Sequence, residues 1–280
     1  MKIAVIGITG MTGAPLADEL LGRGHQVTGI SRNASKLPAR RGLSLRAADI
    51  MDMNQLADAI AGHDVVVTAY SPGHGMGPQI YKDSVEAVWR IKRVFRHVDG
   101  NYLIHIGGAS SLFVQPGIQM FEDPRWPLWF FDTASPEHLR YLAEVTGLEL
   151  FRQVADSRER GVDRQESLSS PDSPEQRLRA LLNEKMQRGP DIAQGCRAQF
   201  ELFRGDTSFR WSFVSPPWFY RPGPRSGRYR TVVDDLPMEG DRPATLFVPD
   251  LALAIADEAE QQQFVHKHWS AARVLADAAA

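Results

Sequence analysis

Three glycines, each three residues after the one before, follow a short apolar segment at the start of the chain: Gly7, Gly10 and Gly13 in MKIAVIGITGMTG. Residues 2–6 are apolar and rich in β-branched side chains, which is typical of a strand buried on both faces of a parallel sheet. Residues 12–21 place leucines at helical spacing, and HQVTGIS then predicts a second strand. Because a strand, a glycine turn, a helix and a strand form a βαβ unit, we expect a doubly wound α/β fold of Rossmann type.

The glycine spacing predicts a site for nucleotide phosphates. Gly7 permits the tight turn after the strand, Gly10 lets the backbone approach a pyrophosphate, and Gly13 lets the helix pack closely on the strand. The first N–H groups of the helix, at the positive end of its dipole, bind phosphate oxygens. The pattern is G-x-x-G-x-x-G rather than G-x-G-x-x-G, and three glycines can also form a turn and nothing more. Within a βαβ unit we favour dinucleotide binding.

The end of the second predicted strand carries a cation where NAD-binding proteins usually have an acidic residue. This position reads Ser31-Arg32-Asn33, with Lys36 nearby and no carboxylate. An arginine can bind a 2′-phosphate bidentately and a serine can donate a hydrogen bond to it. The alternative is a solvated surface arginine. We expect NADP(H) to be preferred over NAD(H).

The next segments continue the alternation of strands and helices. LSLRAADIMD predicts a third strand that ends near Asp49, followed by a helix over residues 53–61. We expect Asp49 and Ile50 to lie beside the adenine, although Asp49 could instead cap that helix. HDVVVTAYSPG predicts a fourth strand, which places Ala69, Tyr70 and Ser71 at the carboxyl edge of the sheet, where such folds bind ligands.

A helix over residues 80–97 and a fifth strand in NYLIHIGGASSL complete this part of the fold. The helical spacing predicts a buried side for this helix. Its expected core residues are Val85, Val88, Trp89 and Phe95. His105 lies between apolar neighbours inside the fifth strand, so we interpret it as a packed histidine and not as a ligand.

The motifs GITGMTG, ISRNASKL, AADIMD, AYSPG, GGASSL, FVSPPWFYRPGPRSGRYR and FVPDLALAIADE together resemble one known family. The chain is similar to atypical short-chain dehydrogenases/reductases of the NAD(P)-binding, NmrA-like and epimerase-like type, over about residues 1–120 and 195–270. The resemblance implies a single Rossmann domain with strand order 3-2-1-4-5-6 and a C-terminal extension that shapes the substrate pocket.

The resemblance also implies roles for individual residues. Ser111 matches a serine that contacts the nicotinamide or the substrate carbonyl in relatives, with Ser110 and Tyr70 as alternates; both serines could instead bond only the turn backbone. Ser215, Pro216, Pro217 and Trp218 stand where relatives approach the nicotinamide. The expected cofactor contacts are Gly7, Thr9, Gly10, Met11, Thr12, Gly13, Ser31, Arg32, Asp49, Ile50, Ala69, Tyr70, Ser71, Gly107, Gly108, Ser215 and Pro216.

The chain departs from that family in its acid–base residues. Short-chain dehydrogenases generally use a Tyr-x-x-x-Lys pair, in which the lysine lowers the pKa of the tyrosine. None of the six tyrosines has a lysine four residues later. This departure fits the atypical branch, whose members include flavin reductases and redox-sensing regulators.

Residues 121–190 are longer than this family requires, and we interpret them as a helical insertion that could form a lid over the cofactor. SPEHLRYLAEV and SPEQRLRALLNEKM predict helices that begin after Ser135 and Ser173, each with proline at its first position. DSRERGVDRQESLSSPDS between them is expected to be an exposed loop. The aromatic segment DPRWPLWFFD could line a pocket for a flat substrate, form an oligomer contact, or make a small satellite core.

Composition excludes several other functions. The 32 basic and 34 acidic residues give a formal net charge of −2, with no basic patch for nucleic acid or for an anionic membrane. No apolar run is long enough to span a membrane. Cys196 is the only cysteine, which excludes a disulfide and fits a reducing, cytoplasmic compartment, and we expect it to be inert. The histidines show no metal-binding spacing, so we expect no metal. His74 is a conceivable proton donor.

Together these features predict an NADP(H)-dependent oxidoreductase that passes a hydride directly to a small molecule. Arg221, Arg225, Arg228 and Arg230 could favour an anionic substrate, or they could simply be surface cations. The alternatives are a non-catalytic NADP(H) sensor that reports to a partner protein and an epimerase-like isomerase. The insertion could also mediate a homodimer.

Overall fold

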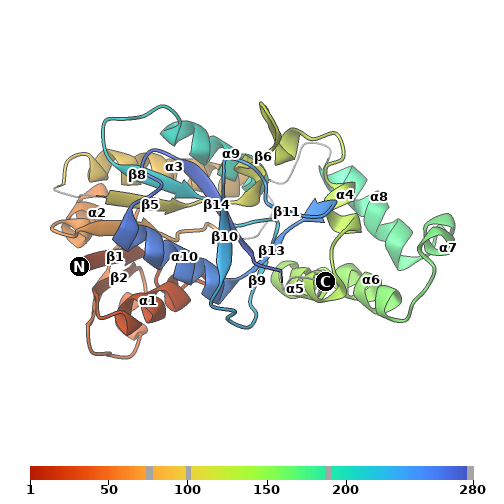
Figure 1. Cartoon of the computed structure of the whole chain (residues 1–280), viewed down its shortest axis with the longest axis horizontal. Coiled ribbons are helices and arrows are strands. Elements are labelled where there is room, and N and C mark those ends of the chain that lie inside the picture. The colour runs from red at the N-terminus through yellow and green to blue at the C-terminus, as the bar shows by residue number, and fades with distance from the viewer. Residues whose placement is uncertain (74–77, 99–101, 187–190, 276–280) are drawn as a thin grey trace.

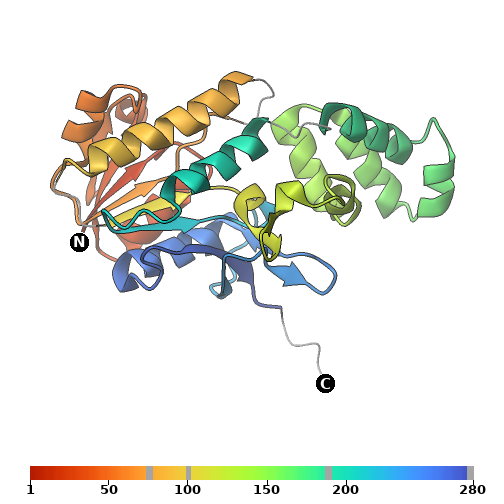
Figure 2. The same ribbon diagram turned by 90° about the horizontal axis from the view of Figure 1, so that it is seen from above.

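The computed structural model describes residues 1–73, 78–98, 102–186 and 191–275. Its centre is an eight-stranded sheet in the order β10-β14-β8-β5-β4-β1-β2-β3, with helices on both faces (Figures 1 and 2). The strands are β1 (Lys2–Ile6), β2 (Gln26–Ser31), β3 (Leu43–Ala47), β4 (Val65–Thr68), β5 (Tyr102–Ile106), β8 (Trp211–Val214), β10 (Tyr229–Val233) and β14 (His268–Arg273). The predicted doubly wound α/β fold is confirmed.

The predicted strand order holds across the first six positions. β3, β2, β1, β4, β5 and β8 are neighbours in that order, and each pair is parallel. Two more strands extend the sheet beyond β8. β14 runs parallel to β8, whereas β10 is antiparallel to β14 and forms the edge. All strands of this sheet except the edge strand β10 therefore end at the same edge, and ligands bind at this edge in such folds.

Alternating residues of the strands enter two separate cores. Ile3 and Val5 pack with helices α1 (Gly13–Gly22) and α10 (Val248–Gln261) on one face. Ala4 and Ile6 pack on the other face with α2 (Met53–Ile60), α3 (Pro78–Phe95) and α9 (Asp191–Phe203). Figure 2 shows these two helical layers with the sheet between them. The central strands β1, β4 and β5 are buried along nearly their whole length because both faces are covered.

One predicted core residue of α3 is on the surface. Trp89 is 44% exposed, and the guanidinium of Arg93 lies 5.5 Å from its ring centroid. The buried stripe of α3 runs through Val88, Ile91 and Phe95 and includes the small residue Ser84. Trp89 lies one position outside this stripe, which is about 100° around the helix. The prediction that it belongs to the core is wrong.

Residues 128–186 form five helices: α4 (Leu128–Asp132), α5 (Pro136–Thr146), α6 (Glu149–Glu159), α7 (Arg164–Ser169) and α8 (Pro174–Met186). α5 and α8 begin as predicted, since Ser135 Oγ accepts a hydrogen bond from the N–H of His138 and Ser173 Oγ accepts one from the N–H of Gln176. The helices enclose a small core of their own around Leu139, Phe151 and Leu178. Figure 1 shows them beyond the end of the sheet at which the parallel strands finish.

The polar segment between these two predicted helices is mostly exposed, as predicted, but much of it is helical and not a loop. Residues 156–173 contain the end of α6 and all of α7. They fold because Arg158 reaches inward: its guanidinium lies 2.6 Å from the buried carboxylate of Glu175 and donates to the carbonyl of Ala134 at 2.7 Å. Charged side chains with internal partners therefore organise a segment whose composition alone predicts solvent exposure.

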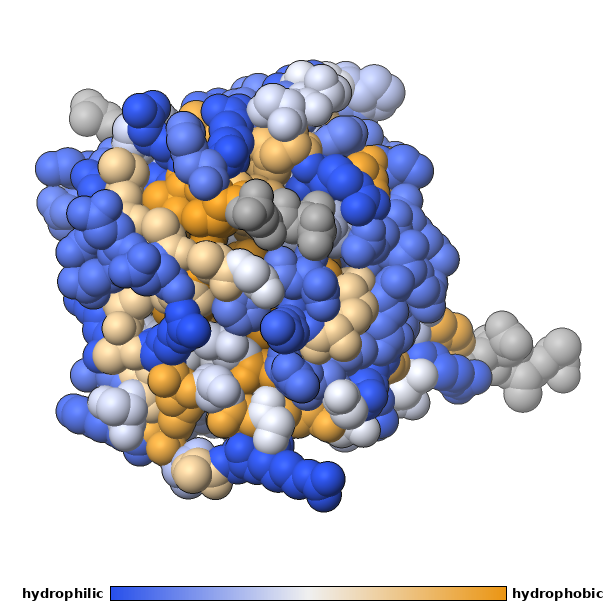
Figure 3. All heavy atoms as spheres, turned by 90° about the vertical axis from the view of Figure 1, so that its left-hand side faces the viewer, coloured by the Kyte–Doolittle hydropathy of each residue, from blue (hydrophilic) through white to orange (hydrophobic). Residues whose placement is uncertain are grey.

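Short elements connect these layers. The three-residue helices are η1 (Ala34–Lys36), η2 (Ala109–Ser111) and η3 (Met120–Glu122). The small strands pair as β6 (Phe113–Gln115) with β7 (Ile118–Gln119), β9 (Phe219–Arg221) with β13 (Thr245–Phe247), and β11 (Met238–Glu239) with β12 (Arg242–Pro243). In the described ranges no helix is both long and apolar enough to cross a membrane. Figure 3 shows the end of the molecule opposite the insertion, where hydrophilic residues surround smaller apolar areas.

Candidate functional site

The glycine loop between β1 and α1 has the shape that its sequence predicts. Gly7 adopts a left-handed φ of +84°, and a Cβ there would lie 2.6 Å from the carbonyl oxygen of Ala69. A Cβ on Gly13 would lie 2.2 Å from the carbonyl oxygen of Gly7. Gly7 is therefore needed for the turn and Gly13 for the close approach of the helix. The same contacts bring Ala69, the residue after β4, against the loop.

The loop presents unpaired donors at the start of α1. Among the residues that the structure describes, the backbone N–H groups of Thr9, Met11 and Thr12 have no acceptor. Thr12 is the N-cap residue of α1, and its side chain makes no capping bond. Free N–H groups at a helix N-terminus bind anions. These residues therefore fit the pyrophosphate of a dinucleotide.

Two polar side chains at the end of β2 are also without partners in the described part of the chain. The hydroxyl of Ser31 is buried and has no hydrogen bond, and the exposed Arg32 has neither an ion pair nor a hydrogen bond. Arg32 lies close enough to Tyr70 to oppose the raised pKa of that phenol, which burial and the nearby Asp83 and Asp49 cause. The ends of β2, β3 and β4 thus meet around Tyr70.

Asp49 does not cap the helix that follows it, and its contact with the adenine stays a prediction. Asp52 caps α2, because its carboxylate accepts hydrogen bonds from the N–H groups of Asn54 and Gln55. Asp49 instead accepts one from the N–H of Met51 at 3.0 Å. The alternative in which Asp49 caps the helix is wrong. Ile50 is 7% exposed and packs in the core under α2, so little of its surface is open to an adenine.

The residues after β4 and β5 lie at the predicted edge. The hydroxyl of Ser71 accepts a hydrogen bond from the N–H of Gly73 at 3.2 Å. A Cβ on Gly107 would lie 2.2 Å from the ring of Phe213, and a Cβ on Gly108 would lie 2.7 Å from the Cys196 sulfur. The two glycines therefore allow β8 and α9 to approach the end of β5, a packing role that the sequence did not indicate.

The two serines of GGASSL point in different directions. Ser110 donates a hydrogen bond to the carbonyl of Ala193 in α9 at 2.8 Å. The Ser111 hydroxyl lies 2.8 Å from both the Gly108 carbonyl oxygen and the Ser215 hydroxyl. Ser111 therefore faces Ser215 at the end of β8 and also bonds the turn backbone, and its role near the nicotinamide stays a prediction. Both Ser111 and Ser215 have 0% exposed surface.

A histidine that sequence reasoning did not identify completes this cluster. Nε2 of His268 lies 3.0 Å from the Ser215 hydroxyl and 3.3 Å from the Ser111 hydroxyl. Burial lowers the pKa of His268 to about 3, so the ring is neutral at physiological pH. Its Nδ1 lies 3.7 Å from a carboxylate oxygen of Asp234. No spacing in the sequence links this histidine to GGASSL.

A second missed residue comes from β9. The Tyr220 hydroxyl lies 2.9 Å from the Thr12 hydroxyl, across 208 positions of sequence. From α5 of the insertion, the Tyr141 hydroxyl donates to the Met11 sulfur at 3.2 Å. The glycine loop is thus contacted both by the C-terminal region and by the insertion.

The aromatic segment forms a small core between the insertion and the sheet. Trp218 is its centre, with ring centroids of Trp126, Phe130 and Phe131 at 4.9, 5.5 and 5.7 Å. Phe130 is fully buried with Leu112, Met120 and Leu236. Of the three interpretations of this segment, these contacts favour the satellite core. Pro216 and Pro217 lead the chain into it and are buried.

Three of the four predicted substrate arginines have contacts within the protein. Arg225 pairs with Glu19 at 2.9 Å, Arg230 donates to the Met238 carbonyl, and the Arg221 guanidinium lies 4.9 Å from the centre of the Phe247 ring. Arg228 is exposed. The contacts of Arg225 and Arg230 are typical of surface arginines. Arg221 differs, because its Nε is buried without a hydrogen-bond partner among the described residues.

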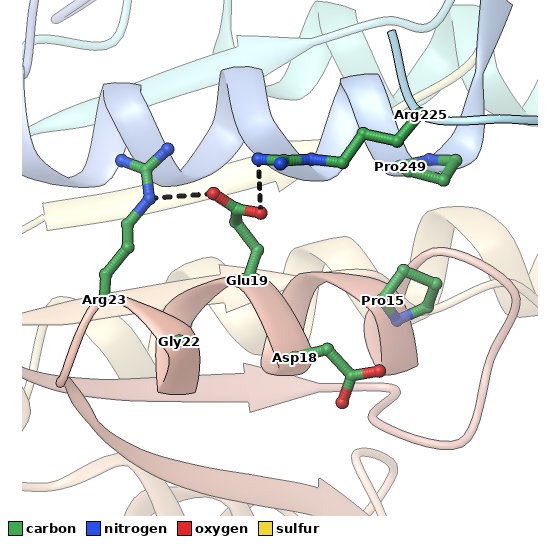
Figure 4. A pocket seen from close by; sticks show the side chains of 7 residues that line it. All are labelled: Pro15, Asp18, Glu19, Gly22, Arg23, Arg225 and Pro249. Atoms are coloured by element: carbon green, nitrogen blue, oxygen red, sulfur yellow. Dashed lines mark hydrogen bonds and ion pairs between the residues drawn. The ribbon is translucent and has the colours of Figure 1, made fainter. Parts of the chain in front are cut away.

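A groove of about 610 Å³ lies between α1 and α10 (Figure 4). Its charges are already paired, since Glu19 binds both Arg23 and Arg225. Thr9, Met11 and Thr12, which carry the unpaired loop amides, are not among its lining residues. We therefore do not place the cofactor there. The lining residues are Pro15, Asp18, Glu19, Gly22, Arg23, Arg225 and Pro249.

Other reactive groups give no second site. Burial raises the pKa of the Cys196 thiol to about 11, which makes it a poor nucleophile at neutral pH. His105 is 1% exposed and stacks on Phe203, so its predicted packing role is confirmed. His74 lies outside the described residues. Within the described ranges, no group of three or more histidine, cysteine or acidic side chains could hold a metal.

The comparisons with known proteins agree with this geometry. Residues 7–98 match the family model described as NAD(P)H-binding. The uncharacterized protein YwnB of Bacillus subtilis is 25% identical over 273 residues, which cover 96% of this chain and 95% of that protein. A proposed epimerase from Bacteroides thetaiotaomicron has a TM-score of 0.69 at 21% identity, covering 98% of both chains. A proposed NADH-flavin reductase from Streptococcus pneumoniae has a TM-score of 0.67 at 18% identity, covering 98% of this chain and all of the other.

The family match assigns the glycine loop and its surroundings to an NAD(P)H-binding domain. The solved structures share the Rossmann fold over nearly the whole length of this chain. The predicted Rossmann fold is therefore confirmed, and the match of residues 7–98 supports the predicted nicotinamide cofactor. The choice between NADP(H) and NAD(H) is a separate question.

Proposed function

We propose that this chain, whose first third is an NAD(P)H-binding domain, is an NADP(H)-dependent oxidoreductase of the atypical short-chain dehydrogenase/reductase class. The observation that supports the cofactor preference is the pair Ser31 and Arg32 at the end of β2. One is a buried hydroxyl without a partner and the other a cation without one, among the described residues. A 2′-phosphate on the adenosine ribose would satisfy both.

The cofactor supplies the hydride, and the protein supplies binding and orientation. The loop amides of Thr9, Met11 and Thr12 would bind the pyrophosphate. Tyr70 lies with Arg32 and Asp49, so we assign it to the adenosine end and not to the reacting end. Ser111, which faces Ser215 and His268, is our candidate for polarising the acceptor: its hydroxyl would exchange its present hydrogen bond to the Gly108 carbonyl for one to the acceptor oxygen. Because Ser111 has no exposed surface, the acceptor can reach it only after a local opening.

The test of the cofactor preference is a fluorescence titration with NADPH and with NADH. We expect micromolar binding of NADPH and much weaker binding of NADH. Arg32→Ala should weaken NADPH binding by roughly tenfold to a hundredfold and leave NADH binding nearly unchanged, because a hydrogen-bonded charge pair contributes about 1.5–3 kcal/mol. Arg41→Ala is the matched control. It removes an exposed arginine just before β3, at the amino end of the parallel strands, whereas Arg32 is at their carboxyl end. Equal binding of both cofactors by the wild type would refute the preference.

A non-catalytic NADP(H) sensor is the second candidate function. Two observations favour it: no tyrosine has a lysine four residues later, and the Ser111 and Ser215 hydroxyls are fully buried. A screen of NADPH oxidation with quinones, flavins and small carbonyl compounds separates the two functions. Turnover that Ser111→Ala abolishes supports catalysis, whereas tight NADPH binding without turnover of any acceptor supports sensing. An epimerase-like isomerase is less favoured, because the tyrosine base is missing.

The partner predictions follow from the same proposal. A small-molecule acceptor and, for a sensor, a protein partner or a second copy of this chain bound through residues 121–190 are the proposed partners. We place the activity in the cytoplasm on the basis of the single cysteine. Light scattering with and without NADPH would show whether the chain self-associates.

A further inference from the structure

The contact between Tyr220 and Thr12 joins the C-terminal region to the loop that binds phosphate. Tyr220 is on β9, in register with Leu246 of β13, and its ring packs on the core beneath α1 and α10. Its hydroxyl ends 2.9 Å from the Thr12 hydroxyl. Thr12 is the N-cap of α1 and does not use its side chain to cap the helix. Thr12 is half-buried, and its hydroxyl has a hydrogen bond with Tyr220 and can make a further one.

We propose that Tyr220 is a positioning residue for the cofactor pyrophosphate, and this inference rests on the proposed cofactor-binding function. The phenol donates its hydrogen to Thr12 Oγ1, and Thr12 in turn directs its own hydrogen to a phosphate oxygen. The two hydroxyls form a short chain of hydrogen bonds that ends on the anion. Such chains are strengthened by mutual polarisation.

The chemistry of the phenol fits this direction of donation. Burial raises the pKa of Tyr220 above its ordinary value, so the hydroxyl stays neutral and keeps its hydrogen. A neutral phenol beside a phosphate is a donor, whereas a phenolate would repel the anion. The opposite direction, from Thr12 to Tyr220, would turn a lone pair of Thr12 toward the phosphate. An anion at the start of α1 therefore favours the arrangement in which Tyr220 donates a hydrogen bond to Thr12 and Thr12 donates one to the phosphate.

A purely structural role predicts a different outcome. If the bond only ties β9 to the loop, its loss lowers stability and changes cofactor binding only as far as the loop shifts. If Tyr220 acts on the pyrophosphate through Thr12, its loss weakens NADPH and NADH by the same factor, because both carry the pyrophosphate. The effect of Arg32→Ala is instead confined to NADPH. The ratio of the NADPH and NADH affinities separates an effect at the pyrophosphate from the effect of Arg32→Ala. The melting temperature separates the structural role, in which the loss of affinity follows a loss of stability, from the positioning role, in which affinity falls while the melting temperature changes little.

The experiment measures NADPH and NADH dissociation constants and the melting temperature of the wild type and five variants. Tyr220→Phe should weaken both cofactors by roughly threefold to tenfold, because one polar contact to a charged system is lost. Thr12→Val should weaken both by at least as much, and Thr12→Ser should restore most of the affinity. The double variant Tyr220→Phe with Thr12→Val should be no weaker than Thr12→Val alone, because the two residues act in series. Tyr141→Phe, which removes only a bond to the Met11 sulfur, should change either affinity less than twofold.

The outcomes distinguish this inference from the proposed function. A wild-type protein that binds neither NADPH nor NADH overturns both. A wild-type protein that binds cofactor, with Tyr220→Phe binding equally well, overturns the role of Tyr220 alone. Additive losses in the double variant also overturn it, since independent contacts would then be at work. If Tyr220→Phe does not fold, Thr12→Val decides, and unchanged binding by that variant refutes the hydrogen-bond chain.

Discussion

The hydroxyls of Ser111 and Ser215 lie 2.8 Å apart, although 104 residues separate them in the sequence. Both residues are completely buried, and Nε2 of His268 lies 3.0 Å from the Ser215 hydroxyl. η2, β8 and β14 meet at this point, each contributing one polar side chain. A buried polar network of this kind fixes the packing of the elements that carry it, because any unsatisfied member is costly.

We predict that Ser111 and Ser215 stabilise the fold jointly. Ser111→Ala or Ser215→Ala should each lower the free energy of unfolding by about 1–2 kcal/mol, because each leaves a buried partner with fewer hydrogen bonds. The double variant should lose less than the sum of the two, since the second substitution removes a bond that is already broken. Urea unfolding of the four proteins measures this. Strict additivity would show that the serines do not interact in solution.

Three buried histidines predict a loss of stability between pH 7 and pH 5. Burial lowers the pKa of His105 to about 4 and those of His138 and His268 to about 3. Their unfolded forms take up a proton near pH 6.5, while the folded forms remain neutral. Unfolding therefore binds protons as the pH falls through this range, and each histidine should lower the free energy of unfolding by about 2 kcal/mol at pH 5. The raised pKa of Glu258 acts in the opposite direction.

His138→Phe tests this explanation. The His138 ring packs edge-on against Phe219 at 5.0 Å, and its Nδ1 has no partner among the described residues. Phenylalanine can occupy the site and cannot titrate, so unfolding of the variant should depend less steeply on pH between 7 and 5. Thermal unfolding of both proteins at several pH values measures the slope. An unchanged slope would mean that His138 takes up its proton over the same pH range in the folded and the unfolded protein.

The local chemistry of the chain predicts the glycine loop and the starts of α5 and α8. Gly7 needs its positive φ whatever surrounds it, and Ser135 followed by proline begins a helix through bonds within one turn. Tyr220 and His268 could not be found in the same way. Their partners Thr12 and Ser215 are 208 and 53 residues away, and only the assembled sheet brings each pair together.

Two errors have equally specific causes. Trp89 is apolar and near the buried stripe of α3, so its exposure depends on the exact rotation of the helix, which Ser84 packing against α9 determines. Residues 156–173 look like a loop because they are charged, but Arg158 and Glu175 pair inside the insertion. Composition predicts solvation, and it does not show which charges find partners.

Alanine substitutions at Gly10 and Gly13 should have different effects, one mainly on NADPH binding and the other mainly on stability. A Cβ on Gly13 would lie 2.2 Å from a backbone oxygen, whereas a Cβ on Gly10 would lie 3.2 Å from the same atom. Gly13→Ala should therefore destabilise the protein by about 3 kcal/mol or more, and Gly10→Ala by less than about 1 kcal/mol. Gly10→Ala should still weaken NADPH by roughly tenfold, because its methyl group enters the space of the pyrophosphate. Denaturation and titration of both variants measure this. Normal NADPH binding by Gly10→Ala would place the phosphates elsewhere.

Phe130 and Trp129 test whether the aromatic segment is a core. Both are on α4, but Phe130 is fully buried, whereas Trp129 is half-buried and its ring is covered by the Arg125 guanidinium at 3.8 Å. Phe130→Ala should lower the free energy of unfolding by about 3–5 kcal/mol, as expected for a large cavity. Trp129→Ala should lower the free energy of unfolding by about 1–2 kcal/mol, because the variant loses one cation–π contact and part of the buried apolar area.

Urea unfolding gives both stabilities, and NADPH oxidation with any acceptor found in the screen gives the activity. A core predicts that Phe130→Ala reduces stability while the Michaelis constant of the acceptor stays within about threefold of the wild type at a temperature where the variant is folded. A substrate pocket predicts the reverse: little change in stability and a large rise in that constant. Because Trp218 of this cluster comes only three residues after Ser215, a rise confined to the acceptor would place the substrate between the aromatic rings and the end of β8.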